Sequence, residues 1–148
     1  MADKAEARCG HVGHPLLVPH LMMALAATGR EHAAQRFLAA LREVAAGAAS
    51  WNAPSIADVI LPSCEAALAH RIGDFERVVE LLAPRREQIR LLGGSNAQRD
   101  RFTQMLVDAA MRAGRRGVVG EIVAHEARTR AVPPAERAGY VAAARWLA

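Results

Sequence analysis

Apolar side chains recur every three or four residues over most of this chain, which is the spacing that places them on one face of an α-helix. Residues 30–46 are typical, because Phe37, Leu38 and Leu41 fall on one side. The breaks in this pattern predict helices over residues 15–28, 30–46, 55–72, 74–92 and 96–112, a sixth after Gly114 that stops near Pro133, and a terminal helix through Tyr140 and Leu147.

Prolines and short polar residues refine these boundaries. Pro62 and Pro84 lack the N–H group that a helix interior needs, so each is expected to kink or break its helix. Asp74 follows Gly73 and is predicted to cap the fourth helix. The longest loop is expected over residues 47–55.

A signal that ends one helix is followed directly by a signal that begins the next at residues 93–96. Gly93 and Gly94 can adopt the positive φ that closes a helix, and Ser95 or Asn96 can accept hydrogen bonds from the first turn of the next one. This segment therefore predicts the tight corner of a helical hairpin.

Arg99 falls three residues before Phe102 on the apolar stripe of the helix that follows this corner. We therefore expect its guanidinium to point towards the core and to need a carboxylate partner. Asp58 or Glu65 of the preceding hairpin could supply that partner.

The same corner brings Ser95, Gln98, Arg99 and Asp100 together, and the cluster has two interpretations. Free N–H groups at a helix N-terminus beside an arginine could bind an anion or a peptide. Alternatively the cluster is structural, with Ser95 as the cap and Asp100 favoured by the positive end of the helix dipole.

An internal repeat appears when the glycine turns are aligned. Gly29, Gly73 and Gly114 each end a helix, 44 and 41 residues apart, and apolar residues follow at the same offsets. A helix pair cannot bury its apolar face alone, so stacked pairs would share one core. The fold class expected is all-α, as a tetratricopeptide-like α-α solenoid of about three hairpins plus a C-terminal capping helix.

Composition supports an all-helical fold. The chain has 33 alanines and only 4% aromatic residues, and it lacks the alternating β-branched runs of strands. Its 148 residues suit one domain. Residues 1–13 lack an apolar period and are expected to be a flexible tail, whereas residues 14–148 form the helical domain.

Residues 9–29 carry no Asp, Glu, Lys or Arg, so a signal peptide or a membrane span has to be considered. Pro15, Pro19 and three histidines interrupt the run, which favours a buried helix. With only two cysteines, Cys9 and Cys64, a disulfide framework is not expected. We expect a reduced, cytoplasmic protein.

Charge is unevenly distributed. Residues 71–148 hold 14 Lys and Arg against 9 Asp and Glu, whereas residues 1–70 hold 5 against 6. This bias could attract an anionic partner or could be a solvated arginine-rich face. Basic and acidic residues interleave and aromatic residues are few, so nucleic acid is not the expected partner.

Several short segments of the sequence resemble those of a known family. They are Leu-Gly-Gly-Ser-Asn-Ala-Gln-Arg-Asp at 92–100, Ala-Ala-Met-Arg-Ala-Gly-Arg at 109–115, and the segments 19–30 and 61–86. Over residues 14–130 the chain resembles the C-terminal part of the tetratricopeptide repeat protein 38 family. The resemblance implies helical repeats and no established reaction.

Metal-binding patterns are incomplete. Cys9, His11 and His14 lack a fourth ligand, and Glu121 with His125 would need a second helix that repeats the pair. Phosphate-binding glycine loops and nucleophile motifs are not found in the sequence. No metal or cofactor is expected.

These observations predict a non-catalytic interaction module that binds a protein or peptide partner. The alternative is an accessory protein that binds a small anionic ligand or assists a biosynthetic enzyme. An open stack also leaves an apolar face to be covered, so self-association through the N-terminal helices is a further hypothesis. A membrane partner is not expected.

Overall fold

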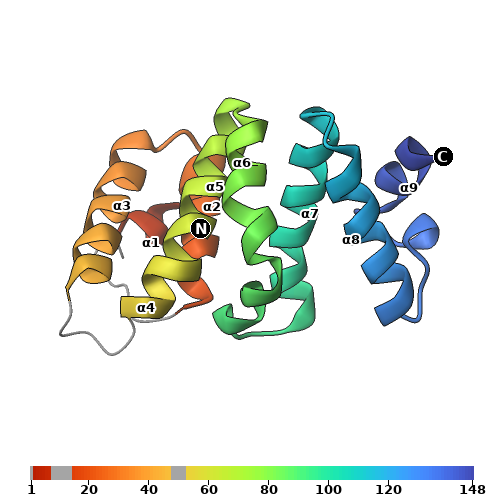
Figure 1. Cartoon of the computed structure of the whole chain (residues 1–148). Coiled ribbons are helices and arrows are strands. Elements are labelled where there is room, and N and C mark those ends of the chain that lie inside the picture. The colour runs from red at the N-terminus through yellow and green to blue at the C-terminus, as the bar shows by residue number, and fades with distance from the viewer. Residues whose placement is uncertain (1, 8–14, 48–52) are drawn as a thin grey trace.

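The computed structural model describes residues 2–7, 15–47 and 53–148, and within those ranges it contains helices and no strand (Figure 1). The elements are α1 (Ala2–Glu6), α2 (Leu17–Ala27), α3 (Glu31–Ala46), α4 (Ala53–Ser55), the π-helical turn η1 (Ile56–Ile60), α5 (Leu61–Ile72), α6 (Phe75–Leu82), the 3₁₀ segment η2 (Ala83–Leu92), α7 (Asn96–Arg112), α8 (Arg116–Thr129), the 3₁₀ turn η3 (Pro134–Glu136) and α9 (Val141–Leu147). None of the described helices is both long enough and apolar enough to cross a bilayer.

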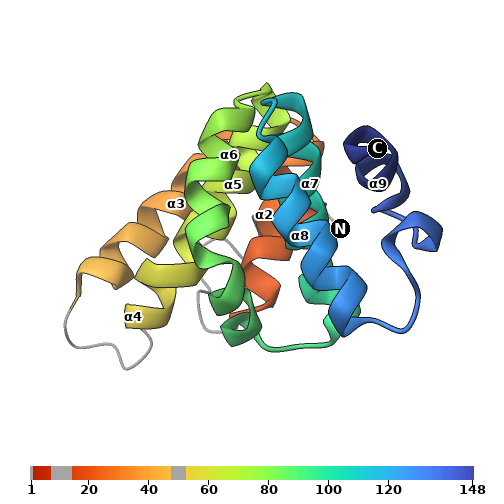
Figure 2. The same ribbon diagram turned by 45° about the vertical axis from the view of Figure 1, so that its right-hand side comes forward.

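The helices pack largely in chain order (Figures 1 and 2). Contacts join α2 with α3, α5 with α6, and α7 with α8, and the first helices of these pairs also contact one another, α2 with α5 and α5 with α7. One apolar cluster includes residues from Ala5 to Ala143. Its many small side chains, such as Ala34, Ala66 and Ala110, let the helices approach closely.

The three predicted glycine turns are built alike. Gly29, Gly73 and Gly114 have φ of +68°, +82° and +68°, where glycine carries no steric penalty. The residue after each glycine donates its N–H to the carbonyl five positions earlier, at 3.1, 2.9 and 2.8 Å. This is the hydrogen bond of a Schellman motif, and it confirms that α2, α5 and α7 end in the same way.

The two proline breaks are also confirmed, and they are connected to each other. Pro62 follows η1, and because it has no N–H the carbonyl of Asp58 loses its helical donor. Arg85 supplies a replacement by donating Nε–H to that carbonyl at 2.9 Å. Arg85 itself follows Pro84, where α6 has already given way to η2.

Residues 1–13 do not match the expected flexible tail over the part that is described. Ala2–Glu6 form α1, which packs on α2 with Ala5 fully buried. Arg30 pairs with Asp3 and, at 2.7 Å, with Glu6. These contacts to a distant arginine hold a helix too short to show an apolar period.

The expected loop at residues 47–55 is shorter at its far end, because Ala53–Ser55 are helical. Residues 48–52, including Trp51, lie outside the described residues, as do residues 8–14.

The first long helix does not present the bare apolar face on which self-association was predicted. Leu21, Met22 and Leu25 of α2 are buried, and α1, α3 and α5 pack against that helix. Among described residues the exposed large hydrophobic side chains are Ile72, Leu91 and Val132, which lie elsewhere.

Candidate functional site

The predicted polar corner exists, and two of its residues close the helix. Gln98 donates its backbone N–H to Ser95 Oγ at 3.3 Å, and Ser95 donates its own to Gln98 Oε1 at 2.9 Å. This reciprocal capping box satisfies two N–H groups at the start of α7. Ser95 Oγ and Gln98 Oε1 therefore accept hydrogen bonds from within the chain.

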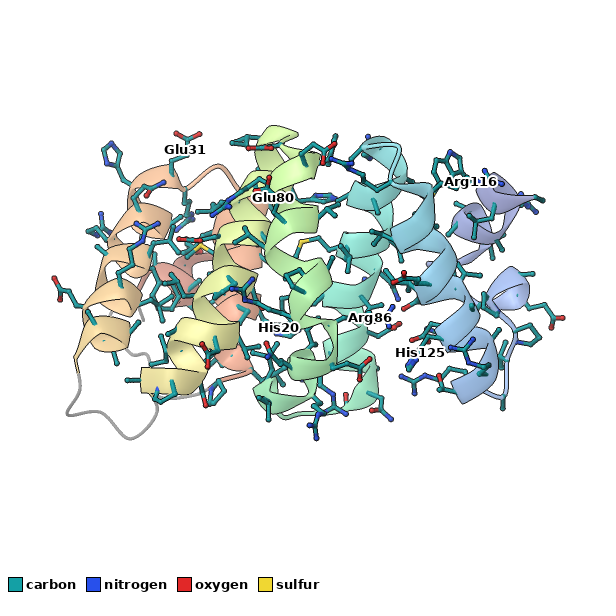
Figure 3. All side chains as sticks on the ribbon, in the orientation of Figure 1. His20, Glu31, Glu80, Arg86, Arg116 and His125 are labelled. Atoms are coloured by element: carbon teal, nitrogen blue, oxygen red, sulfur yellow. The ribbon has the colours of Figure 1, made fainter. Side chains whose placement is uncertain are left out.

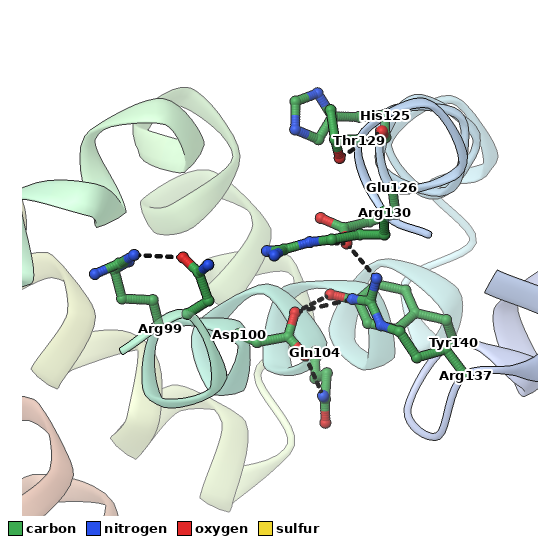
Figure 4. Close-up of polar contacts among 10 residues, drawn as sticks. Arg99, Asp100, Gln104, His125, Glu126, Thr129, Arg130, Arg137 and Tyr140 are labelled. Carbon is green, nitrogen blue, oxygen red and sulfur yellow. Dashed lines mark hydrogen bonds and ion pairs between the residues drawn. The ribbon is translucent and has the colours of Figure 1, made fainter. Parts of the chain in front are cut away.

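Arg99 is not paired as predicted. It is half-buried and donates from Nη1 to the carbonyls of Gly93, at 3.0 Å, and Gly94, and from Nη2 to Asn96 Oδ1 at 2.5 Å (Figure 4). Glu65, one of its expected partners, pairs instead with Arg42 at 2.7 Å. The first turn of α7 directs Arg99 back onto its own corner, so the expected ion pair was wrong.

Asp100 faces the C-terminal segment (Figure 4). Its carboxylate accepts hydrogen bonds from Tyr140 Oη at 2.5 Å, Arg137 Nη2 at 3.1 Å and Gln104 Nε2 at 2.7 Å. The Arg137 guanidinium also lies 4.0 Å from the centre of the Tyr140 ring. Burial raises the pKa of Tyr140, and the bond to Asp100 adds to this shift. Asp100 therefore anchors the C-terminal segment to α7.

Glu126 completes this polar cluster. Its side chain is 8% exposed, and Oε2 lies 2.6 Å from Arg137 Nη1 in an ion pair whose angle falls outside hydrogen-bond geometry. Arg130 approaches the same oxygen at 3.4 Å. The sequence analysis did not single out Arg137, Tyr140 or Glu126. The sequence did contain an indication of Glu126, because this acidic residue falls on the apolar stripe of α8, four positions after Ile122.

His70 and Asp108 form a second polar link, between α5 and α7. His70 Nε2 lies 2.7 Å from Asp108 Oδ2, and Arg112 Nε donates to the same carboxylate at 3.0 Å. The His70 ring also packs edge-on against Phe75. Asp108 is thus partnered by His70 and Arg112.

His20 behaves as an ordinary core histidine (Figure 3). Its Nδ1 lies 2.8 Å from the Leu16 carbonyl oxygen, and its ring packs edge-on against Phe102. Within the described ranges, no group of three or more His, Cys, Asp or Glu side chains is arranged to hold a metal ion. Cys64 is a free, buried cysteine, and burial raises the pKa of its thiol.

Two adjoining hollows form the largest recess at the end of the molecule that carries α2, α3 and α5. One, of about 180 Å³, lies between α2, α5 and α7. The other, of about 480 Å³, lies where the ends of α2, α3 and α5 meet. Ala26 and Arg71 line both hollows, so the two hollows adjoin each other. We call this recess the α2–α5–α7 groove.

The groove combines apolar side chains with Arg71, and Arg30, Glu31 and His70 also line it. Met23, Ala27 and Met105 line the hollow between α2, α5 and α7, and Ile72 lines the other hollow with 76% of its surface exposed. Arg71 Nε donates to the Ala26 carbonyl at 3.1 Å, which holds the guanidinium over the groove. In the described part of the chain no carboxylate forms an ion pair with Arg71. The arrangement can therefore receive apolar side chains beside a carboxylate.

No family model matches the chain, and no solved structure matches it.

Proposed function

We propose that this chain is a non-catalytic helical-repeat interaction module whose α2–α5–α7 groove binds a peptide segment of a partner protein. The observation that carries the proposal is the groove itself, which crosses the first helices of three successive helix pairs and includes exposed Ile72. A surface shared by several helices suits an extended ligand, because each helix adds a contact along its length.

In this proposal the pairs α2/α3, α5/α6 and α7/α8 are repeats of a tetratricopeptide-like solenoid, and α9 is its cap. The three matching glycine turns support this arrangement, as do the contacts between first helices of neighbouring pairs. The resemblance to the tetratricopeptide repeat protein 38 family belongs to the same proposal. A buried free thiol at Cys64 fits the reduced, cytoplasmic setting that we propose.

The chemistry of the groove defines the peptide. Methionine is unbranched and adapts to apolar side chains of different shape, so Met23 and Met105 suit a partner with one or two bulky apolar residues. Arg71 has N–H donors left after its bond to Ala26, and a guanidinium binds a carboxylate through two parallel bonds. We therefore propose a short apolar segment that carries an acidic residue.

Selection from a displayed library of random short peptides tests this proposal. The chain should enrich peptides with an acidic residue next to bulky apolar ones. The best of them should bind the Arg71→Gln and Ala27→Glu variants at least about tenfold more weakly, measured by fluorescence anisotropy. Ala27 is exposed at the end of α2, so a glutamate there fills the groove without disturbing the core.

The matched control is Ala39→Glu. Ala39 is an exposed alanine in the middle of α3 and does not line the groove. This variant should bind the selected peptides within about twofold of the unmodified chain. Failure to enrich any peptide, or equal binding to Ala27→Glu, would contradict the proposal.

A second copy of the chain is another protein partner to be considered. Sedimentation at micromolar concentration distinguishes this case, because self-association would depend on concentration and a monomer would exclude it.

A further inference from the structure

A separate cavity of about 200 Å³ lies between η2, α7 and α8. Four arginines line it, with Arg86 and Arg90 on η2, Arg99 on α7 and Arg130 directly after α8. Figure 3 shows Arg86 and His125 at a similar level of the molecule, on the neighbouring elements that flank this space. We call it the arginine cavity.

The carboxylates of the arginine cavity are largely used by other groups. Three of them line it, against four arginines, and two of the three, Asp100 and Glu126, bind Arg137, which is not among the lining residues, while Glu126 also lies 3.4 Å from Arg130. The third, Glu87, approaches Arg86 only at 3.7 Å. The lining arginines therefore keep an excess of positive charge that the cavity itself does not neutralise.

Two of these arginines are held in place by uncharged partners. Arg99 donates to two backbone carbonyls and to the Asn96 amide oxygen, and Arg90 Nε donates to the Glu87 backbone carbonyl at 3.2 Å. Such bonds orient a guanidinium without cancelling its charge. Each guanidinium has five N–H donors, so several remain for a ligand.

From this arrangement we infer that the arginine cavity binds a small molecule bearing a phosphate monoester or a diphosphate. A guanidinium matches two phosphate oxygens at once, and a phosphate group offers enough acceptors for arginines that arrive from several directions. The cavity is smaller than the roughly 300–1,000 Å³ of drug-sized sites. It therefore suits a phosphate or diphosphate with a small organic part, for which Ile89 and Ile122 provide an apolar wall.

This site is independent of the proposed peptide groove. The groove is formed by α2, α3, α5 and one side of α7, whereas the arginine cavity uses η2, α8 and the first turns of α7. Failure of one binding test therefore leaves the other unaffected.

Isothermal titration calorimetry with pyrophosphate tests the inference, with inorganic phosphate and glycerol 3-phosphate as smaller probes and citrate as a carboxylate of high charge. We expect pyrophosphate to bind in the micromolar range and citrate at least about tenfold more weakly. The double variant Arg86→Gln, Arg130→Gln should weaken pyrophosphate binding at least about tenfold. The double variant Arg86→Lys, Arg130→Lys keeps the charge but loses the two-pronged donors, and it should fall in between.

The matched control is Arg101→Gln with Arg128→Gln. Both arginines are exposed, lie on α7 and α8 beside the cavity, and do not line it, so the control removes the same amount of charge close to the site. It should leave pyrophosphate affinity within about twofold. Equal weakening in the control, equal binding of citrate, or no binding of pyrophosphate at millimolar concentration would each overturn the inference.

Discussion

Alkaline conditions should unfold this protein, because two of its weak acids are fully buried. Tyr140 precedes α9 and Cys64 lies in α5, and both have 0% exposed surface. Burial raises the pKa of each group, and for Tyr140 the hydrogen bond to Asp100 adds to the shift. Both therefore stay protonated in the folded state. In the unfolded chain the thiol ionises near pH 8.5 and the phenol near pH 10.

The direction of the effect follows from proton linkage. Both folded pKa values are raised, so the stabilisation is complete below the unfolded values and declines as the pH rises above them. Each group then removes about 1.4 kcal/mol per pH unit. At about pH 11 this amounts to about 3 kcal/mol for Cys64 and about 1.4 kcal/mol for Tyr140. The sum is a large part of an ordinary unfolding free energy of about 5–15 kcal/mol.

The composition of the chain makes this measurement unusually clean. Tyr140 is the only tyrosine, and Lys4 is the only lysine among basic residues that are otherwise arginines, which stay charged. Urea unfolding followed by circular dichroism gives the free energy at each pH. Near-ultraviolet phenolate absorbance reports Tyr140 directly. We expect phenolate to appear only as helix is lost.

Two variants separate the contributions. Cys64→Ala should remove about 3 kcal/mol of the decline between neutral pH and about pH 11, and Tyr140→Phe about 1.4 kcal/mol. Both variants should be less stable than the unmodified chain at neutral pH, which does not affect these slopes. A phenolate signal with its midpoint near pH 10 in a chain that is still fully helical would refute the reasoning.

Three further predictions concern the α7 corner, each measured as the free energy of unfolding in urea. Gly93→Ala should cost about 1–3 kcal/mol, because its φ of +75° with ψ of −158° is a conformation almost exclusive to glycine. Gly94→Ala should cost more than Gly93→Ala, because its Cβ would also lie 2.1 Å from Leu16 Cδ2. Equal losses would show that Leu16 gives way. Ser95→Ala should cost about 1 kcal/mol through loss of the cap, and no change would mean that water replaces it. Asp100→Ala should cost about 3 kcal/mol, since it leaves a buried phenol without its acceptor and removes one of the two carboxylates that pair with Arg137, and a loss below about 1 kcal/mol would contradict this role.

The helices and their turns were predictable because their determinants are local. The spacing of apolar residues and the identity of neighbouring residues decide whether a helical turn forms. Gly29, Gly73 and Gly114 end their helices with hydrogen bonds that span only six residues. The cap of α6 by Asp74, which accepts the Arg77 N–H at 3.1 Å, belongs to the same class. Such signals are fully contained in the sequence.

Polar partners were not predictable in the same way. The spacing between Arg99 and Phe102 indicated on which side of the helix Arg99 lies. It did not show that the first turn of α7 extends beyond the part of the helix that packs on the core. The partners of Asp100 lie 37 and 40 residues away along the chain. Local patterns carry no information about such pairs.

The C-terminal end of the molecule is attached by a different kind of contact from the rest. Along the row of helices, neighbouring elements share buried aliphatic side chains, but the buried residue of α9 itself is only Ala143. Its last turn is held by Arg116, which donates to the carbonyls of Trp146, at 3.1 Å, and Leu147.

The segment that leads into α9 is held by the bonds of Tyr140 and Arg137 to Asp100. A terminal element of a stacked fold needs a polar outer face, and arginine supplies both the attachment and that face. Trp146 and Leu147 also pack partly against the core. Because surface polar contacts contribute less than a packed aliphatic seam, we expect α9 to open more readily than the helices of the central row. Ionisation of Tyr140 at high pH would act on this element first.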